Sequence, residues 1–501
     1  MSKKVSIAVF SALGVIIASL AVALIMTVVG RNKIIAELDG LNDQLASEGA
    51  ELESTLAELQ INKASLEAEM ASLQTKVADL EEKMTDSGKY YADEIAALKL
   101  EISVKNNEIA ALEADIAKYQ TVFTIDVRAQ AQLIDDIERY IATQCPYVRM
   151  EKPAQIDEDG NPVETNSEEP EYIWVKVDDL IDEAISAREE SSENAEPLFT
   201  PEELEASGMT EEELTRSILR RAVLAREDVF YPSVSVYYED LATGYHYGYN
   251  ENVPYNSASV IKAPYILSVL RDIAADERAY LDAKEALGEM PEKIDTDDDG
   301  ILDKTVIEYS DPSYDLSEVV IYDSKTMQKE GSGKIKDMAD GTEFTYVDFV
   351  KYALEYSDNV AYQQLKNRFG YDRYYALARE VKATSVLRNA VNMTAADAGK
   401  LFKAIYEFIE EDETYGKLMY DSMRKGNHTV IIPYGVYPTP TLHKYGWDTD
   451  SYHDAAIVLN GDKPYILTVF TDLDNGGDDV NAYLRQIVKL VNKLHKGFYQ
   501  S

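Results

Sequence analysis

The chain has 501 residues, which is more than one ordinary domain needs, so we expect several parts. It carries 49 Lys and Arg against 91 Asp and Glu, a formal net charge of −42, and this balance excludes a nucleic-acid partner because phosphates require a basic face. The single cysteine, Cys145, excludes an intramolecular disulfide and a cysteine zinc cluster, while a hydrophobic content of 45% is enough for a packed core.

Residues 5–30 form an uncharged, mostly apolar run that follows Lys3 and Lys4. At about 1.5 Å per residue, a helix of this length crosses the apolar core of a bilayer. The alternative is a cleaved signal peptide, but its apolar region is usually only about 7–15 residues long and ends at small residues. The run therefore predicts an uncleaved single-pass anchor in the cell membrane. Basic residues flank it on both sides, and we expect residues 1–4 in the cytoplasm and the bulk of the chain outside.

Residues 34–119 show the pattern of a coiled coil. Leucine recurs every seven residues from Leu38 to Leu80, and a second apolar run with spacings of three and four extends from Ile95 to Tyr119. The interruption at residues 85–89 leaves two architectures open, an antiparallel hairpin within one chain or a parallel pair of chains. The second would make the chain a homo-oligomer.

Residues 120–202 are interpreted as a helical and acidic connector, since acidic, turn-rich segments separate two short helical patterns. Thr210 and Glu213 have the spacing of a capping box and indicate entry into a folded domain, which we place at residues 203–501. Alternating residues at 233–238 and 245–249 predict a β-hairpin.

Ser259 and Lys262 follow this hairpin and are three residues apart. At the start of a helix this spacing puts both side chains on one face, where the amine can approach the serine oxygen. Pro264 supports an opening helical turn, because a proline deeper in a helix would remove a hydrogen bond. Serine is a weak nucleophile until a base takes its proton, so the pair suggests nucleophilic catalysis.

Two further motifs follow in order: Ser357-Asp358-Asn359 on a predicted helix, then Lys444-Tyr445-Gly446 before a pair of predicted strands. Ser-x-x-Lys, Ser-Asp-Asn and Lys-x-Gly in this order resemble the class A β-lactamases and related penicillin-recognising serine enzymes, over roughly residues 228–499. The resemblance implies an α/β (α+β) domain with an antiparallel sheet flanked by helices.

The resemblance also implies roles for individual residues. Ser259 would attack a carbonyl with Lys262 as its base, and Ser357 would relay a proton to the leaving nitrogen. Asn359 would hold the substrate amide, and Lys444 would attract the substrate carboxylate. Tyr445, Gly446 and Asp448 would contact the substrate, with the amides of Ser259 and Asp448 stabilising the oxyanion. The implied substrate is a β-lactam or a peptidoglycan-like peptide, and no cofactor is needed for catalysis.

Two departures from the pattern of the β-lactamases bear on the expected activity. The stretch at residues 383–394, where the β-lactamases carry a glutamate that activates water, contains no Asp or Glu. Tyr445 replaces the usual Thr or Ser of the third motif. We therefore do not expect fast hydrolysis of a β-lactam. A catalytically silent envelope scaffold that acts through its coiled coil stays open as the alternative.

An insertion at residues 277–335 contains a sequence that resembles the start of a calcium loop. Carboxylates at alternate positions around a glycine can surround one hard cation, but the glutamate that closes a full EF-hand loop is missing. A structural calcium ion and a solvated acidic turn both remain open. The candidate ligands are Asp295, Asp297, Asp299, Ile301 and Asp303.

Overall fold

The structure is a computed structural model of the chain. It describes residues 60–77, 99, 102–110, 127–152, 172–191, 199–295, 302, 304–327, 330–473 and 477–499. The anchor predicted at residues 5–30 lies outside them. Within the described ranges, every helix is too short or too polar to span a bilayer. The chain divides into two compact units, residues 1–124 and 125–501.

The first unit contains two described helical segments, residues 60–77 and 102–110. An ion pair of 3.2 Å joins Lys105 of one segment to Glu69 of the other. Leu73, Val77 and Ile109 are buried. A straight helix would hold positions 69 and 105 about 54 Å apart at 1.5 Å per residue, so this contact within one chain favours the hairpin alternative. The coiled coil itself stays a prediction.

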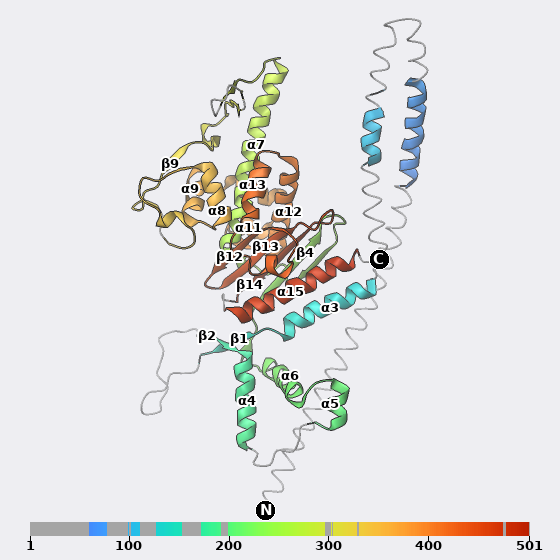
Figure 1. Ribbon diagram of the computed structural model, residues 1–501, viewed down its shortest axis with the longest axis vertical. Coiled ribbons are helices and arrows are strands. Elements are labelled where there is room, and N and C mark those ends of the chain that lie inside the picture. The colour runs from blue at the N-terminus through green and yellow to red at the C-terminus, as the bar shows by residue number, and fades with distance from the viewer. Residues whose placement is uncertain are drawn as a thin grey trace, which may run out of the picture. The chain divides into compact units, whose positions relative to one another are not determined.

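The second unit is built on a five-stranded antiparallel sheet (Figure 1). Its strand order is β12-β13-β14-β4-β5, so the hairpin of β4 and β5 completes a sheet whose other strands come from the end of the chain. This confirms the mixed fold with an antiparallel sheet flanked by helices. The strands are β4 (Val234–Asp240), β5 (His246–Tyr249), β12 (Thr441–Asp448), β13 (Ser451–Val458) and β14 (Tyr465–Thr471).

Both faces of this sheet are covered by helices, which explains why β4, β13 and β14 are buried along their whole length, whereas β5 and the end of β12 are partly exposed. Neighbouring residues of a strand point to opposite faces, and Ala455 and Ala456 of β13 accordingly belong to two different apolar cores. One core packs against α7 (Lys262–Ala286), α8 (Tyr346–Glu355), α12 (Ala395–Glu411) and α13 (Tyr415–Arg424). The other packs against α3 (Val127–Thr143), α14 (Ile432–Gly435) and α15 (Asp478–Gly497).

Smaller elements complete the face of the sheet that packs against α7, α8, α12 and α13. The helices are α9 (Asn359–Phe369), α10 (Asp372–Glu380) and α11 (Thr384–Arg388), with 3-10 turns η1 (Ala258–Ile261), η2 (Pro312–Tyr314) and η3 (Ile335–Asp337). Three two-stranded pairs are β6 (Tyr255–Asn256) with β11 (Asn392–Met393), β7 (Lys293–Ile294) with β8 (Lys304–Thr305), and β9 (Val319–Ile321) with β10 (Glu343–Thr345). The last two pairs and η2 include parts of the predicted insertion.

Residues assigned to the connector pack within the second unit. The helix α3 runs beside α15 (Figure 1), where Tyr140 stacks on Tyr483 and the Tyr483 hydroxyl donates to the carbonyl of Ile141 at 2.9 Å. A three-stranded sheet of β2 (Tyr172–Lys176), β1 (Tyr147–Glu151) and β3 (Val229–Phe230) follows. Three further helices are α4 (Val177–Ser191), α5 (Pro201–Ser207) and α6 (Glu211–Leu224), of which α6 begins with the predicted Thr210–Glu213 capping box.

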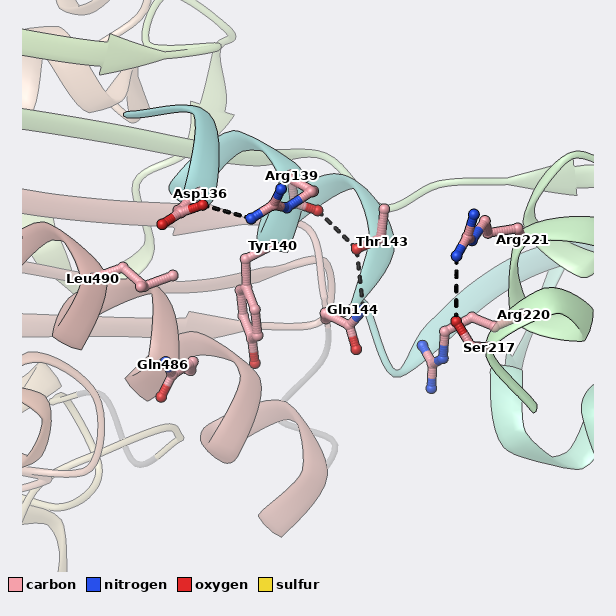
Figure 2. A pocket seen from close by; sticks show the side chains of 10 residues that line it. All are labelled: Asp136, Arg139, Tyr140, Thr143, Gln144, Ser217, Arg220, Arg221, Gln486 and Leu490. Carbon is pink, nitrogen blue, oxygen red and sulfur yellow. Dashed lines mark hydrogen bonds and ion pairs between the residues drawn. The ribbon is translucent and has the colours of Figure 1, made fainter. Parts of the chain in front are cut away.

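A cavity of about 680 Å³ lies among α3, α6 and α15 (Figure 2). Its arginines have partners within the chain: Arg139 binds Asp136, Arg221 binds the Ser217 hydroxyl, and Arg220 binds the carbonyl of Cys145. None of the predicted site residues lines this cavity.

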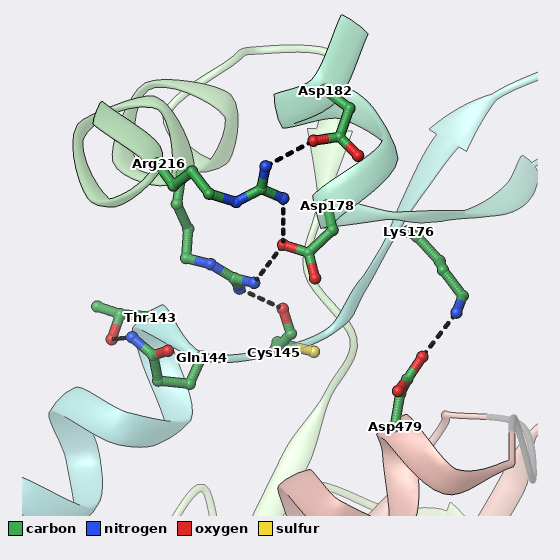
Figure 3. A network of polar contacts seen from close by, with 9 residues as sticks. Thr143, Gln144, Cys145, Lys176, Asp178, Asp182, Arg216 and Asp479 are labelled. Carbon is green, nitrogen blue, oxygen red and sulfur yellow. Dashed lines mark hydrogen bonds and ion pairs between the residues drawn. The ribbon is translucent and has the colours of Figure 1, made fainter. Parts of the chain in front are cut away.

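Ion pairs connect the small sheet and its helices (Figure 3). Arg216 of α6 contacts Asp182 at 2.7 Å, and Arg220 contacts Asp178 at 3.2 Å. Lys176 reaches Asp479 of α15 at 2.6 Å. The carboxylates are more than half exposed, so solvent screens these pairs and they contribute little to stability.

Replacing Ile137 by alanine tests whether α3 is an integral part of the second unit. Ile137 is fully buried in the core shared with α15, so the smaller side chain should lower the free energy of unfolding by about 2–5 kcal/mol. Urea unfolding followed by circular dichroism measures this change. Asp135→Ala, at an exposed position of the same helix, is the control. Equal stability of both variants would show that α3 is only a linker.

Candidate active site

Ser259 lies in η1, the short turn that leads directly into α7. Its side chain is half-buried. The preceding Ala258 has φ of 45°, in the left-handed region that costs a residue with a Cβ about 1–3 kcal/mol and often occurs at functional sites. Lys262 is the first residue of α7 and is only 2% exposed. The predicted spacing therefore does place the serine and the lysine in one opening turn.

The Lys262 amine binds the second motif. Its Nζ donates to the Ser357 carbonyl at 2.5 Å and to Asn359 Oδ1 at 2.6 Å, and it lies 3.3 Å from Ser357 Oγ. A neutral amine has two hydrogens and one lone pair. Because these two oxygens can take both hydrogens, the lone pair of a neutral Lys262 is left for a proton from another group.

The Lys444 amine connects the third motif to Ser357 of the second motif. Its Nζ donates to Ser357 Oγ at 2.9 Å and to the Tyr445 carbonyl at 2.8 Å. Ser357 Oγ therefore lies between the amines of Lys262 and Lys444, although these residues are far apart in sequence. Ser259 lies in the turn that leads directly to Lys262. All five residues predicted to be catalytic therefore lie in one region of the structure.

Burial changes the proton affinity of both lysines. Desolvation lowers the pKa of Lys262 to about 7, and the negative charge of Asp358 partly opposes this shift. Burial also lowers the pKa of Lys444 well below its usual value, and the nearby positive charge of Lys262 adds to the effect. A lysine with a pKa near neutrality can act as a general base, which an ordinary exposed lysine cannot do at pH 7.

Gly446 brings β12 close to the nucleophile turn. A Cβ added at this position would lie 2.8 Å from the Ser257 carbonyl oxygen and 3.0 Å from the Ser259 amide nitrogen. Both are backbone atoms, which cannot rotate away. The lack of a side chain at Gly446 therefore keeps the strand beside the Ser259 amide, the proposed oxyanion donor.

Gly446→Ala should reduce acylation by a reactive penicillin. The methyl group would push β12 away from η1 and displace the oxyanion donors, so we expect a loss of about 10²-fold or more. Stopped-flow measurement of the acylation rate tests this. Gly461→Ala is the control, because a Cβ there meets no atom within 4 Å and only its φ of 61° is strained. An unchanged rate in Gly446→Ala would show that the close approach of β12 to η1 does not position the oxyanion donors.

The second motif is supported by a loop that the sequence did not assign to the site. The Asp358 carboxylate is fully buried and accepts hydrogen bonds from the amides of Lys334 at 2.6 Å and Ile335 at 2.8 Å. The backbone amide of Asn359 donates to the Ser332 carbonyl at 3.0 Å. Ser357 itself has φ of 54°. Asp358 thus holds the second motif in place. The acidic residue in the middle of Ser-Asp-Asn is the sequence feature that could have indicated this role.

Tyr445 and Asp448 have different surroundings. Tyr445 is half-buried, and its ring lies 4.2 Å from the ring of His428, a contact that the sequence did not predict. The Lys444 amine also lies 4.2 Å from the Tyr445 ring centroid. Asp448 is exposed at the end of β12 and accepts a hydrogen bond from the Thr449 amide. Tyr445 therefore adds an aromatic ring to the site, and its phenol hydroxyl interacts with Ser357 and Ser332 in place of the usual Thr or Ser hydroxyl.

The segment at residues 383–394 lies next to the nucleophile turn, since β11 pairs with β6 and the Ser257 amide donates to the Val391 carbonyl. The nearby buried Asp397 is engaged by the amide and hydroxyl of Ser385 at 2.8 and 2.6 Å. Glu380 forms a 3.0 Å ion pair with Arg271. Both carboxylates thus already have partners within the chain.

The calcium prediction falls mainly outside the described residues. Asp295 is described, whereas Asp297, Asp299, Ile301 and Asp303 are not. Among the described residues, no group of three or more potential ligands is arranged to hold a metal ion. The calcium loop therefore stays a prediction.

Several solved structures are similar to part of the chain. A mutant of PBP-A in its acyl-enzyme complex with penicillin G has 14% identity and a TM-score of 0.39, covering 53% of this chain and 90% of that chain. A β-lactamase from Sphaerobacter thermophilus DSM 20745 has 16% identity and a TM-score of 0.41, covering 53% and 92%. An ancestral class A β-lactamase has 15% identity and a TM-score of 0.39, covering 52% and 94%.

A comparison with curated proteins finds no match. The model of the Beta-lactamase enzyme family, in contrast, matches residues 219–310 and 301–494, which is more than half of the chain and includes all three motifs. This match confirms the resemblance to the class A β-lactamases. The chain therefore belongs to the Beta-lactamase enzyme family.

Proposed function

We propose that the chain is an active-site-serine acyl transferase or hydrolase. The observation that carries this proposal is the buried Lys262, which has a pKa of about 7 and whose two hydrogens are taken by Ser357 and Asn359. Family membership alone does not establish activity. The retained lysine, placed one helical turn after Ser259, supplies the base that a serine nucleophile needs.

In the proposed reaction, Lys262 takes the hydroxyl proton of Ser259 as Oγ attacks the substrate carbonyl. The oxyanion is stabilised by the Ser259 amide and by an amide of β12 just after Gly446, Trp447 or Asp448. The carbon–nitrogen bond then breaks, and the leaving nitrogen receives a proton through Ser357, which lies between the two lysines. The product is an acyl-serine ester.

We further propose a β-lactam or a peptidoglycan-like peptide as the substrate, with its carboxylate near Lys444. Because residues 383–394 carry no acid to activate water, release of the acyl group should be slow. This favours a penicillin-binding peptidase over a resistance β-lactamase. No metal or organic cofactor is required for these steps, and calcium would only stabilise the insertion.

The predicted anchor at residues 5–30 and coiled coil at residues 34–119 would present this domain outside the cell membrane. The Lys105–Glu69 contact favours a stalk made by one folded-back chain. Association of several chains stays a prediction that analytical ultracentrifugation of the detergent-solubilised chain can test.

A chromogenic cephalosporin in excess separates the candidate functions. We expect one burst of product equal to the protein concentration, followed by slow turnover, because acylation outpaces release. Sustained fast turnover would instead show a β-lactamase with another route to activated water. Absence of the burst would favour the silent scaffold, which the missing acid and Tyr445 leave as the second candidate.

A further inference from the structure

His443 lies on the face of β12 opposite to Lys444, because neighbouring residues of a strand alternate. It is only 3% exposed. Its Nδ1 lies 3.1 Å from Asp454 Oδ1, and Asp454, which is fully buried, also accepts a hydrogen bond from the Ile432 amide at 3.0 Å. The ring is thus held in a fixed orientation.

The other ring nitrogen, His443 Nε2, is buried and has no hydrogen-bond partner among the residues that the structure describes. A buried polar atom without a partner costs about 1–3 kcal/mol. His443 also lines a cavity of about 710 Å³ between β12, α14 and α15. A ligand atom that reached this nitrogen would supply its missing partner.

The cavity has an unusual charge for this chain. Its lining includes Arg424 and Lys489 but no Asp or Glu, although acids outnumber bases 91 to 49 in the whole sequence. Arg424 is held by a 3.0 Å hydrogen bond to the Thr441 carbonyl. The positive charges of Arg424 and Lys489 on this lining favour an anionic ligand.

The remaining walls are partly apolar. They include Pro433, Tyr434, Tyr437 and Pro438 as well as three threonines, Thr429, Thr439 and Thr441, and the two tyrosines are 57% and 83% exposed. Arg485 already covers the Tyr434 ring at 4.0 Å. The exposed aromatic surface fits a flat apolar group, so the charge and the walls together select an organic acid over a small inorganic anion.

We propose that this cavity binds a small aromatic carboxylate, with one carboxylate oxygen at His443 Nε2 and the ring against the proline and tyrosine wall. The Nδ1 hydrogen of His443 faces the Asp454 carboxylate, so the proton between Nε2 and the carboxylate oxygen is taken up from solvent when the ligand binds, and Lys489 supplies the opposing charge. The site is separate from the serine and does not depend on the proposed acyl transfer. His443 directly precedes Lys444, so an occupied cavity lies against the strand that carries the active-site lysine.

Titration calorimetry of the full chain with benzoate, and with benzamide as the neutral match, tests this proposal. We expect one saturable benzoate site and binding of benzamide that is at least about tenfold weaker, as expected for a lost charge-assisted hydrogen bond. His443→Asn keeps a donor toward Asp454 and removes Nε2, and it should weaken benzoate binding about fivefold or more. Lys489→Gln, at an exposed position, should weaken it in the same direction and leaves the fold intact.

Either of two results would overturn the proposal. The first is no saturable binding of benzoate, or benzamide binding as tightly as benzoate. The second is wild-type affinity in His443→Asn. Should His443→Asn fail to fold, the result for Lys489→Gln decides alone.

Discussion

Replacing Lys262 by methionine is expected to slow acylation by a reactive penicillin by about 10³-fold, within the range for loss of a general base. Methionine fills a similar volume but cannot accept the Ser259 proton. Lys366→Met is the matched control, because both lysine amines lie near the Tyr362 ring, at 5.8 Å for Lys262 and 5.5 Å for Lys366. The control should acylate at the wild-type rate, and equal rates in all three proteins would exclude Lys262 as the base.

The pH dependence of wild-type acylation gives a second test of the same lysine. Since burial lowers its pKa to about 7, Lys262 is protonated below that pH and cannot take the serine proton. The rate should therefore fall about tenfold per pH unit below 7 and level off above it. Lys262→Arg stays protonated and should be inactive throughout. A wild-type rate that is unchanged from pH 5 to pH 9 would contradict the assignment.

Asp358→Asn is expected to have the next largest effect on acylation, because Asp358 both positions the second motif and influences the pKa of Lys262. The carboxylate binds the amides of Lys334, Ile335 and Ala361, so its loss should reduce acylation about 10²-fold and lower the free energy of unfolding by about 1–3 kcal/mol. Asp358 also raises the pKa of Lys262. Without its charge, the midpoint of the pH profile should move below 7.

Asp348→Asn provides the comparison for this variant. Asp348 caps the neighbouring helix α8 through Thr345 in a similar way, and it is not among the charges that shift Lys262. Its replacement should lower stability and leave the pH midpoint unchanged. If the two variants had the same pH profile, the role of Asp358 would be structural only.

The sequence motifs located the candidate site residues better than the contacts that hold these residues in place. Ser259, Lys262, Ser357, Asn359 and Lys444 could be identified because each belongs to a short motif whose order is informative. The contact of Tyr445 with His428 could not, since the two residues share no pattern and meet only when β12 folds. Similarly, the apolar stripe of α3 shows that the helix packs against something, but only the structure identifies α15 as its partner.

The position of the unpartnered His443 illustrates the same limit. A lone histidine beside a motif lysine is most simply interpreted as a strand residue, and it is one. That this histidine lines a cavity with two basic residues depends on α14 and α15, which come from different parts of the sequence.

The central claim is that Ser259 forms an acyl-enzyme. The most direct measurement is the intact mass of the full chain after exposure to a reactive penicillin, followed by peptide mapping, with Ser259→Ala in parallel. The account predicts a persistent mass increase of one penicillin, located on Ser259 and missing in the variant. An adduct on another residue, or an unmodified chain beside intact penicillin, would contradict it.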